Sequence, residues 1–73
     1  MPRFYFNIID NRFLPDPIGA ECADMVVVRR CAVRAAGEML REFSDDVAGT
    51  SDWQMIVTDE ASHPVLNLKF SIH

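Results

Sequence analysis

The sequence predicts an α+β protein in which one amphipathic helix packs on one face of a four-stranded antiparallel sheet, in the order ββαββ. Two observations lead to this fold. Segments with alternating apolar residues lie toward both ends of the chain, and one long segment between them has helical periodicity. At 73 residues the chain has room for a single small domain, 1–73.

The first strand is predicted over residues 3–9. There Phe4, Phe6 and Ile8 share one face of the strand, and the aromatic and β-branched content favours extended backbone. Residues 10–12 are expected to form a turn, because Asp and Asn tolerate left-handed backbone angles. The chain should therefore reverse direction after the first strand.

The second strand should be short, irregular and at the edge of the sheet. Prolines lack the amide that a ladder needs, so only the part after Pro17 is expected to pair. Ile18, Ala20 and Cys22 would then share one face.

A helix is predicted over residues 25–43. Asp24 precedes it and offers a side-chain oxygen to the first free amides, which is typical of a helix N-cap. The apolar positions recur at helical spacing on one broad arc, which we expect to face the sheet. They are Met25, Val28, Ala32, Ala35, Ala36, Met39, Leu40 and Phe43.

The opposite side of this helix carries Arg30, Arg34 and Arg41, a candidate basic patch for nucleic acid. Glu38 interrupts the patch and lies four residues from Arg34, which allows a weak ion pair. A solvated helix surface is the preferred interpretation, since the formal charge of −4 opposes binding to phosphate. Val27 and Cys31 are also expected near this polar side.

The end of the chain predicts a hairpin. Residues 44–52 are rich in Asp, Ser and Gly and favour a loop, and the strands 53–59 and 65–72 follow with the loop 60–64 between them. The predicted inward residues are Trp53, Met55, Val57, Leu66, Leu68, Phe70 and Ile72.

Several segments resemble a family of short alphaproteobacterial proteins, frequent in rhizobia, known as the domain of unknown function numbered 6894. They are the opening MPRFYF, the segment DPIGAE at 16–21, the aspartate before the helix, and a Val-x-Asp-Glu sequence at 57–60. The family pattern often has a turn glycine where this chain has Asn11 and Ser62. The resemblance implies the fold and brings no known activity, cofactor or catalytic residue. A looser likeness in element order to antitoxin subunits of the HicB type concerns architecture only.

No residue is predicted to be catalytic, to bind a cofactor or to ligate a metal, and we expect no enzymatic activity. His63 lies in a loop and His73 is the last residue, so no regular element positions either. The chain has no glycine-rich phosphate loop and no Cys/His set with zinc spacing. Cys22 and Cys31 are expected to be unpaired small side chains, since the chain carries no secretion signal and the cytoplasm is reducing.

One helix can cover one face of a sheet only, so the other face is the candidate interaction surface. Tyr5, Ile9 and Ile56 could form an apolar strip on it, surrounded by amides and hydroxyls. The candidate interaction residues are Tyr5, Asn7, Ile9, Gln54, Ile56, Thr58 and Lys69.

We therefore expect a cytoplasmic interaction module that binds another protein or forms a homodimer. The alternative is an antitoxin-like or regulatory protein that binds nucleic acid with its helix arginines, although nucleic acid is the less favoured partner. No run of about 18 apolar residues is present, so a membrane span is not expected, and no small-molecule substrate is indicated.

Overall fold

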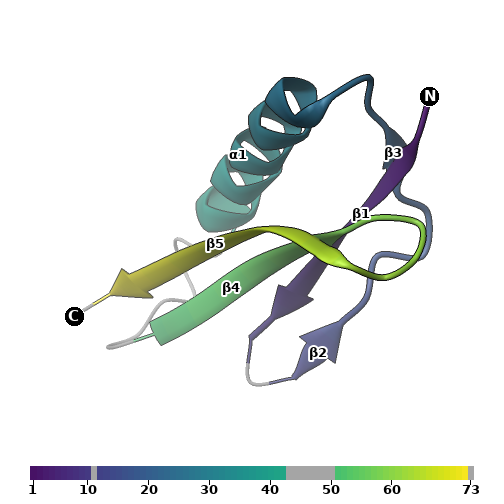
Figure 1. The fold of residues 1–73 in the computed structure, drawn as a ribbon. Coiled ribbons are helices and arrows are strands. Elements are labelled where there is room, and N and C mark those ends of the chain that lie inside the picture. The colour runs from purple at the N-terminus through teal and green to yellow at the C-terminus, as the bar shows by residue number, and fades with distance from the viewer. Residues whose placement is uncertain (11, 43–50, 73) are drawn as a thin grey trace.

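The computed structural model describes residues 1–10, 12–42 and 51–72. Its elements in chain order are β1 (Arg3–Ile9), β2 (Phe13–Leu14), β3 (Ala20–Glu21), α1 (Met25–Glu42), β4 (Ser51–Thr58) and β5 (Pro64–Ile72). The fold class is α+β, as predicted, with α1 packed on one side of an antiparallel sheet (Figure 1). The sheet has five strands rather than the four expected.

The strand order is β2-β1-β4-β5, and β3 pairs with β1 on the same edge as β2. The long strands β1 and β4 are therefore central, and β5 forms the far edge. Each strand runs antiparallel to its neighbours, with Tyr5 opposite Thr58 and Ile56 opposite Asn67.

The prediction for the second strand was wrong in one respect. The chain pairs with β1 twice, first at Phe13–Leu14 and again at Ala20–Glu21, so part of the ladder lies before Pro15 and not only after Pro17. Between the two short strands the chain leaves the ladder, because Pro15 and Pro17 have no amide to donate.

The predicted cap and helix are confirmed at the described residues. The Asp24 Oδ1 accepts a hydrogen bond from the Val27 amide at 3.0 Å, which satisfies one of the free donors of the first turn. Glu42 is the last residue of α1, and the expected Phe43 position lies outside the described residues. Most of the predicted loop 44–52 also lies outside the described residues. Its last two residues belong to β4, which begins at Ser51.

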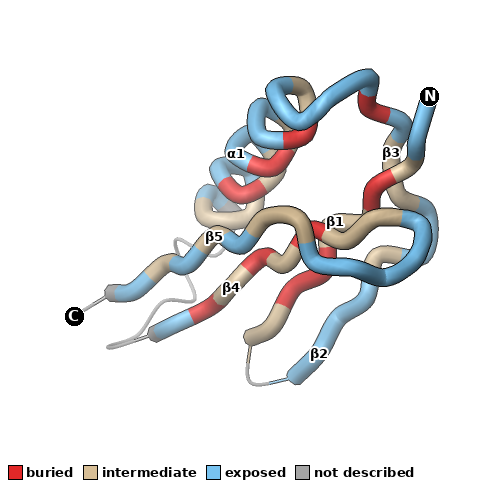
Figure 2. Tube along the Cα trace, viewed as in Figure 1, coloured by how far each residue is buried: buried red, intermediate tan, exposed pale blue. Residues whose placement is uncertain are grey.

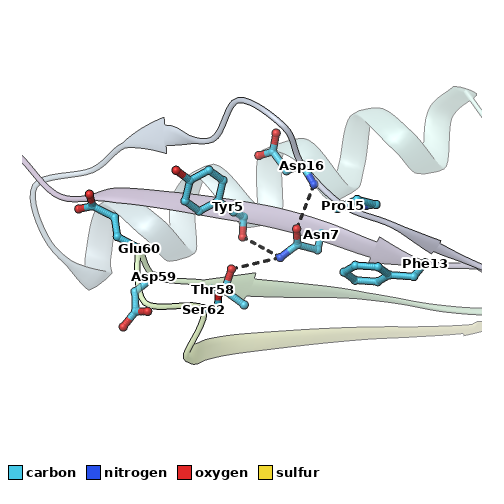
Figure 3. A pocket seen from close by; sticks show the side chains of 9 residues that line it. All are labelled: Tyr5, Asn7, Phe13, Pro15, Asp16, Thr58, Asp59, Glu60 and Ser62. Atoms are coloured by element: carbon cyan, nitrogen blue, oxygen red, sulfur yellow. Dashed lines mark hydrogen bonds between the residues drawn. The ribbon is translucent and has the colours of Figure 1, made fainter.

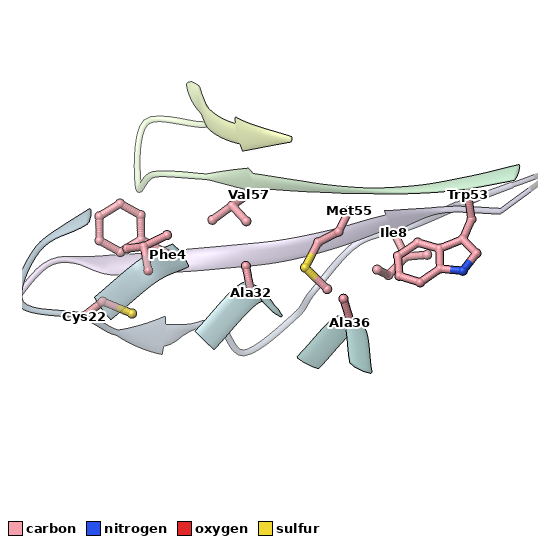
Figure 4. Packing of buried hydrophobic residues seen from close by; sticks show 9 residues of the cluster. Phe4, Ile8, Cys22, Ala32, Ala36, Trp53, Met55 and Val57 are labelled. Carbon is pink, nitrogen blue, oxygen red and sulfur yellow. The ribbon is translucent and has the colours of Figure 1, made fainter. Parts of the chain in front are cut away.

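The core lies between α1 and the sheet (Figures 2 and 4). On the helix, Val28, Ala32 and Ala36 are buried, and small alanines let the helix approach the sheet closely. Trp53 and Phe70 stack beneath it with ring centroids 4.6 Å apart. The whole buried cluster comprises Phe4, Ile8, Cys22, Val28, Ala32, Ala36, Trp53, Met55 and Val57.

Three helix positions differ from the prediction. Met25 is 40% exposed although it was expected in the core, because it begins the helix beyond the end of the buried stripe. Val27 and Cys31, expected near the polar side, are half-buried and pack against the core. The covered stripe is therefore slightly rotated relative to the predicted arc, since it includes Val27 and Cys31 and excludes Met25.

Candidate functional site

The side of the sheet opposite α1, called the open face below, carries rows of side chains set by the strand register; three central rows lie between the pairs Arg3–Glu21 at one end and Asp52–Ser71 at the other. One row is Tyr5, Thr58 and Pro64. The middle row is Asn7, Ile56 and Asn67. The third row is Phe13, Ile9, Gln54 and Lys69.

The predicted apolar strip is present on the open face and is larger than expected. Tyr5, Ile9 and Ile56 are half-buried by their neighbours. Phe13 of β2 pairs with Ile9 and adds an aromatic ring that is 59% exposed. Sequence reasoning missed Phe13 because β2 was not predicted, although the apolar pair Phe13-Leu14 directly before Pro15 was the available signal.

Asn7 is buried, although it was expected to be exposed on the open face. It is 7% exposed and lies under the segment that joins β2 to β3. Its Nδ2 donates to the Ile56 carbonyl at 3.0 Å and to the Thr58 hydroxyl at 3.2 Å, and its Oδ1 accepts from the Asp16 amide at 2.9 Å. An amide side chain can be buried without a large loss of stability when its donor and acceptor groups are hydrogen-bonded in this way.

Asp16 fastens the same segment to β1. One carboxylate oxygen accepts from the Phe6 amide at 3.1 Å, where the ladder is interrupted, and the other accepts from the amides of Ile18 and Gly19. Burial alone would raise the pKa of Asp16, but the three amide donors together lower it. The carboxylate thus takes the place of the backbone acceptor that a continuous second strand would supply.

Gly19 allows this segment to return to β1. Its φ of +73° is in the left-handed region, and a Cβ there would lie 2.7 Å from the Phe4 carbonyl oxygen and 2.9 Å from the Tyr5 ring. Only glycine fits both requirements. Residues 16–19, Asp-Pro-Ile-Gly, therefore hold the chain between β2 and β3 to β1 through hydrogen bonds, and we call this segment the polar clip.

The hairpin 59–63 closes the other end of the open face. Asp59 Oδ1 accepts from the amides of Ala61 and His63, both at 2.9 Å, and Glu60 Oε1 accepts from the Arg3 amide at 3.1 Å. Ser62 has a φ of 65°, in the left-handed region that glycine adopts most easily. Asp59 and Glu60 thus order the turn and hold it beside the start of β1.

These segments enclose a hollow of about 540 Å³ on the open face (Figure 3). Carboxylates of Asp16, Asp59 and Glu60 line it together with the Tyr5 and Phe13 rings, and no lysine or arginine does. Its remaining walls are Asn7, Pro15, Thr58 and Ser62. This end of the open face is consequently electronegative, with aromatic walls suited to a cation.

The opposite surface of the molecule is the outer side of α1. Arg30, Arg34 and Arg41 are exposed there as predicted, and Arg29, which was not predicted, joins them. Exposed valines at Val26 and Val33, each 63% exposed, lie between the arginines. Within the described part of the chain the ion pairs are Arg3–Glu21 and His63–Asp59, so the expected Arg34–Glu38 pair does not form there.

The two cysteines are free thiols packed at the start of the helix. Cys22 is 1% exposed, and burial raises its pKa, with the neighbouring Cys31 adding to the rise. A thiol with a raised pKa stays protonated at neutral pH and is a poor nucleophile.

No group of three or more His, Cys, Asp or Glu side chains is placed to hold a metal ion across residues 1–10, 12–42 and 51–72. In the same ranges, no helix combines the length and the apolar character needed to cross a membrane.

The family model described as "Domain of unknown function (DUF6894)" matches residues 3–71. The chain therefore belongs to this family, as the resemblance implied; the expected alphaproteobacterial origin stays a prediction. No curated protein and no solved structure matches the chain.

Proposed function

We propose that this member of the DUF6894 family is a non-enzymatic protein-interaction module that binds its partner through the open face. The observation that carries the proposal is the apolar strip of Tyr5, Ile9, Phe13 and Ile56, which α1 does not cover because it packs on the other side of the sheet. Four apolar side chains on one face form a patch rather than scattered exposure.

The composition around the strip suits a contact with a protein. Thr58, Gln54, Asn67 and Lys69 surround it with hydroxyl, amide and ammonium groups, as a polar rim surrounds an apolar interface centre. The hydrogen bonds of Asn7 and Asp16 hold the strands in place beneath it. A surface ordered before binding loses less conformational entropy on association.

A photo-crosslinking experiment tests the proposal. Benzoylphenylalanine replaces Phe13 on the open face or, as a matched control, Val33 on the outer side of α1; the two positions are 59% and 63% exposed. After irradiation of the native cells, we expect protein adducts from position 13 and far fewer from position 33. Absence of adducts at position 13, or equal yields at both positions, would overturn the proposal.

The alternative function, binding of nucleic acid, has one observation in its favour. Arg29, Arg30 and Arg34 are exposed and form no ion pair within the described residues. Binding through them should weaken steeply with added salt and be lost in the Arg30→Glu, Arg34→Glu double variant. The acidic balance of the chain, formally −4, makes this the second choice.

We place the activity in the cytoplasm. Two unpaired cysteines, one of them buried in the core, suit a reducing compartment. No step of the proposed binding requires a cofactor or a metal ion.

A further inference from the structure

We propose that two copies of this chain pair through the outer edge of β5, strand beside antiparallel strand, so that their sheets join into one. This edge is a different surface from the open face, and the dimer therefore goes beyond the proposed function. Three features of β5 support it: an edge that no other described element pairs with, the outward direction of its peptide groups, and the pattern of its side chains.

The two edges of the sheet are finished differently. The edge beyond β1 is covered by the chain's own β2, β3 and polar clip. At the opposite edge, no described element pairs with the outer side of β5. β5 is nine residues long, and its register with β4 shifts only beside Pro64 and is continuous from Leu66 to Ile72. A long, regular edge strand is a template for pairing with another strand.

The direction of the β5 backbone follows from the hydrogen bonds of β1. The Phe6 amide donates to Asp16, so the peptide groups of Phe6 point away from β4, and those of its partner Val57 must point toward β5. Because this direction alternates along a strand, the β5 residues that bond to β4 are Leu66, Leu68 and Phe70. The residues between and after them direct their amides and carbonyls outward, and these are Asn67, Lys69 and Ser71.

On the side of α1, the apolar side chains of β5 are covered incompletely. Leu66, Leu68 and Phe70 are half-buried and pack at the margin of the core (Figure 2). The residues opposite them on β4 are all buried, and these are Val57, Met55 and Trp53. The difference arises because α1 lies closer to β4 than to β5. A further strand beside β5 would cover the exposed parts of its apolar side chains and extend the core.

The edge of β5 is complementary to itself. Leu68 is the midpoint of Pro64–Ile72, so a two-fold axis through Leu68 pairs the strand with its copy over its full length. Leu66 then faces Phe70 of the second copy on the helix side of the sheet, and Asn67 faces Lys69 on the other side. An axis through Lys69 would instead place the two lysines directly opposite each other, which disfavours that register.

The two-fold axis is perpendicular to the sheet, so both helices lie on one side of the dimer and both open faces on the other. β4 and its copy are then three strand spacings apart, or about 14 Å at 4.8 Å per spacing. A helix with its side chains is about 10–12 Å wide, so both helices fit. The dimer presents two copies of the apolar strip side by side to one partner.

Light scattering behind size-exclusion chromatography tests the dimer, and a substitution at Lys69 tests its main-chain pairing. The mass of the unmodified chain should rise with concentration, up to millimolar protein, from 8.3 kDa toward twice that value. Lys69 is exposed and directs its amide outward, so Lys69→Pro removes a donor of the dimer and no bond between β4 and β5. We expect at least tenfold weaker self-association. Lys69→Ala is the matched control, because it keeps the amide and should still dimerise; circular dichroism checks that both variants fold.

Engineered cysteines test the register without a proline. Asn67→Cys of one copy should lie opposite Lys69→Cys of the other, with Cα atoms about 5.5 Å apart, which is within disulfide range. Under copper–phenanthroline oxidation, an equimolar mixture of the two variants should form a disulfide dimer. Each variant alone should form far less, because its cysteines are diagonal neighbours about 7–8 Å apart. The unmodified chain under the same oxidation controls for Cys22 and Cys31.

Each outcome has a defined meaning. A dimer that Lys69→Pro abolishes and Lys69→Ala keeps supports the β5 pair, as does a disulfide that forms preferentially in the mixture. A chain that stays monomeric at all concentrations, a dimer that Lys69→Pro leaves intact, or equal disulfide yields in the mixture and the single variants would overturn it. Adducts from position 13 to another protein test the open face separately, so a monomeric chain with such adducts keeps the proposed function and loses only the dimer.

Discussion

The two faces of β1 are ordered by different forces. On the face toward α1, Phe4 and Ile8 are buried among aliphatic and aromatic side chains and make no directional contact. On the open face, Asn7 is equally buried but is held by hydrogen bonds to the backbone, to Thr58 and to the segment 15–19. One face is ordered by packing and the other by polar bonds.

The difference shows why the open face can remain hollow. A packed core requires side chains that fill the space, because each cavity loses contacts. A hydrogen-bonded segment requires only correctly placed donors and acceptors, so the chain between β2 and β3 can run along the edge of β1 without filling the space beside it. The hollow beside Tyr5 is thus a consequence of the polar clip.

The largest effect is expected in the packed face. Met55 is 1% exposed at the centre of the core, and Met55→Ala should lower the free energy of unfolding by about 2–5 kcal/mol through lost burial and the cavity that remains. Met25→Ala is the matched control, because Met25 is 40% exposed and the same atoms are removed there. Urea denaturation measures both; equal losses would show that the helix end is packed like the core.

The next effect concerns the hydrogen-bonded face. Asn7→Ala should lower the free energy of unfolding by about 2–3 kcal/mol, since it removes the donor to Ile56 and leaves the Asp16 amide without its acceptor. Asn67→Ala removes the same side chain at an exposed site with one bond to Gln54 and should cost little. A loss below about 0.5 kcal/mol in Asn7→Ala would mean that water replaces its bonds.

The same contrast explains what the sequence could predict. Phe4, Val28, Met55 and the other buried residues recur at strand or helix periods, and periodicity reports directly which side meets the core. The fold class and the capping residue Asp24 follow from such local patterns. The covered face was therefore largely predictable from the sequence, apart from Met25, Val27 and Cys31 at the margins of the helix stripe.

The site was predictable only in part, because it depends on contacts between distant segments. Tyr5, Ile9, Ile56 and Thr58 lie on the open face as expected from alternation. Alternation could not show that Asn7 is buried, because the segment over it is placed by the Asp16 carboxylate and by Gly19. No local period predicts a side chain that replaces a missing strand.

Acid should weaken the polar clip selectively. The pKa of Asp16 is lower in the folded chain than its ordinary value of 3.8, so its contribution is complete at neutral pH and is lost as pH falls through the folded-state pKa. Asp16→Asn should lower the free energy of unfolding by about 1 kcal/mol at pH 7, because an amide nitrogen would face the amide donors of the clip.

The difference between Asp16→Asn and the wild type should shrink as the pH falls below 3.8. Asp52→Asn, at an exposed position of β4, is the control and should follow the wild type throughout. Urea titrations at a series of pH values measure the difference. A constant difference at all pH values would show that the charge of Asp16 is not what stabilises the clip.

The smallest effect distinguishes backbone strain from packing at the edge of the hollow. Ser62 has a φ of 65°, which costs an L-residue free energy that glycine avoids, so Ser62→Gly should raise the free energy of unfolding by up to about 1 kcal/mol. Gly37→Ala should raise it by a similar amount for the opposite reason: Gly37 is in the middle of α1, where alanine is favoured, and a Cβ meets nothing within 4 Å. Thermal unfolding of both variants and the double variant should give additive gains, since the sites are in separate elements. A destabilised Ser62→Gly variant would show that the serine side chain itself supports the turn, and the wall of the hollow would then depend on a contact beyond its backbone bonds.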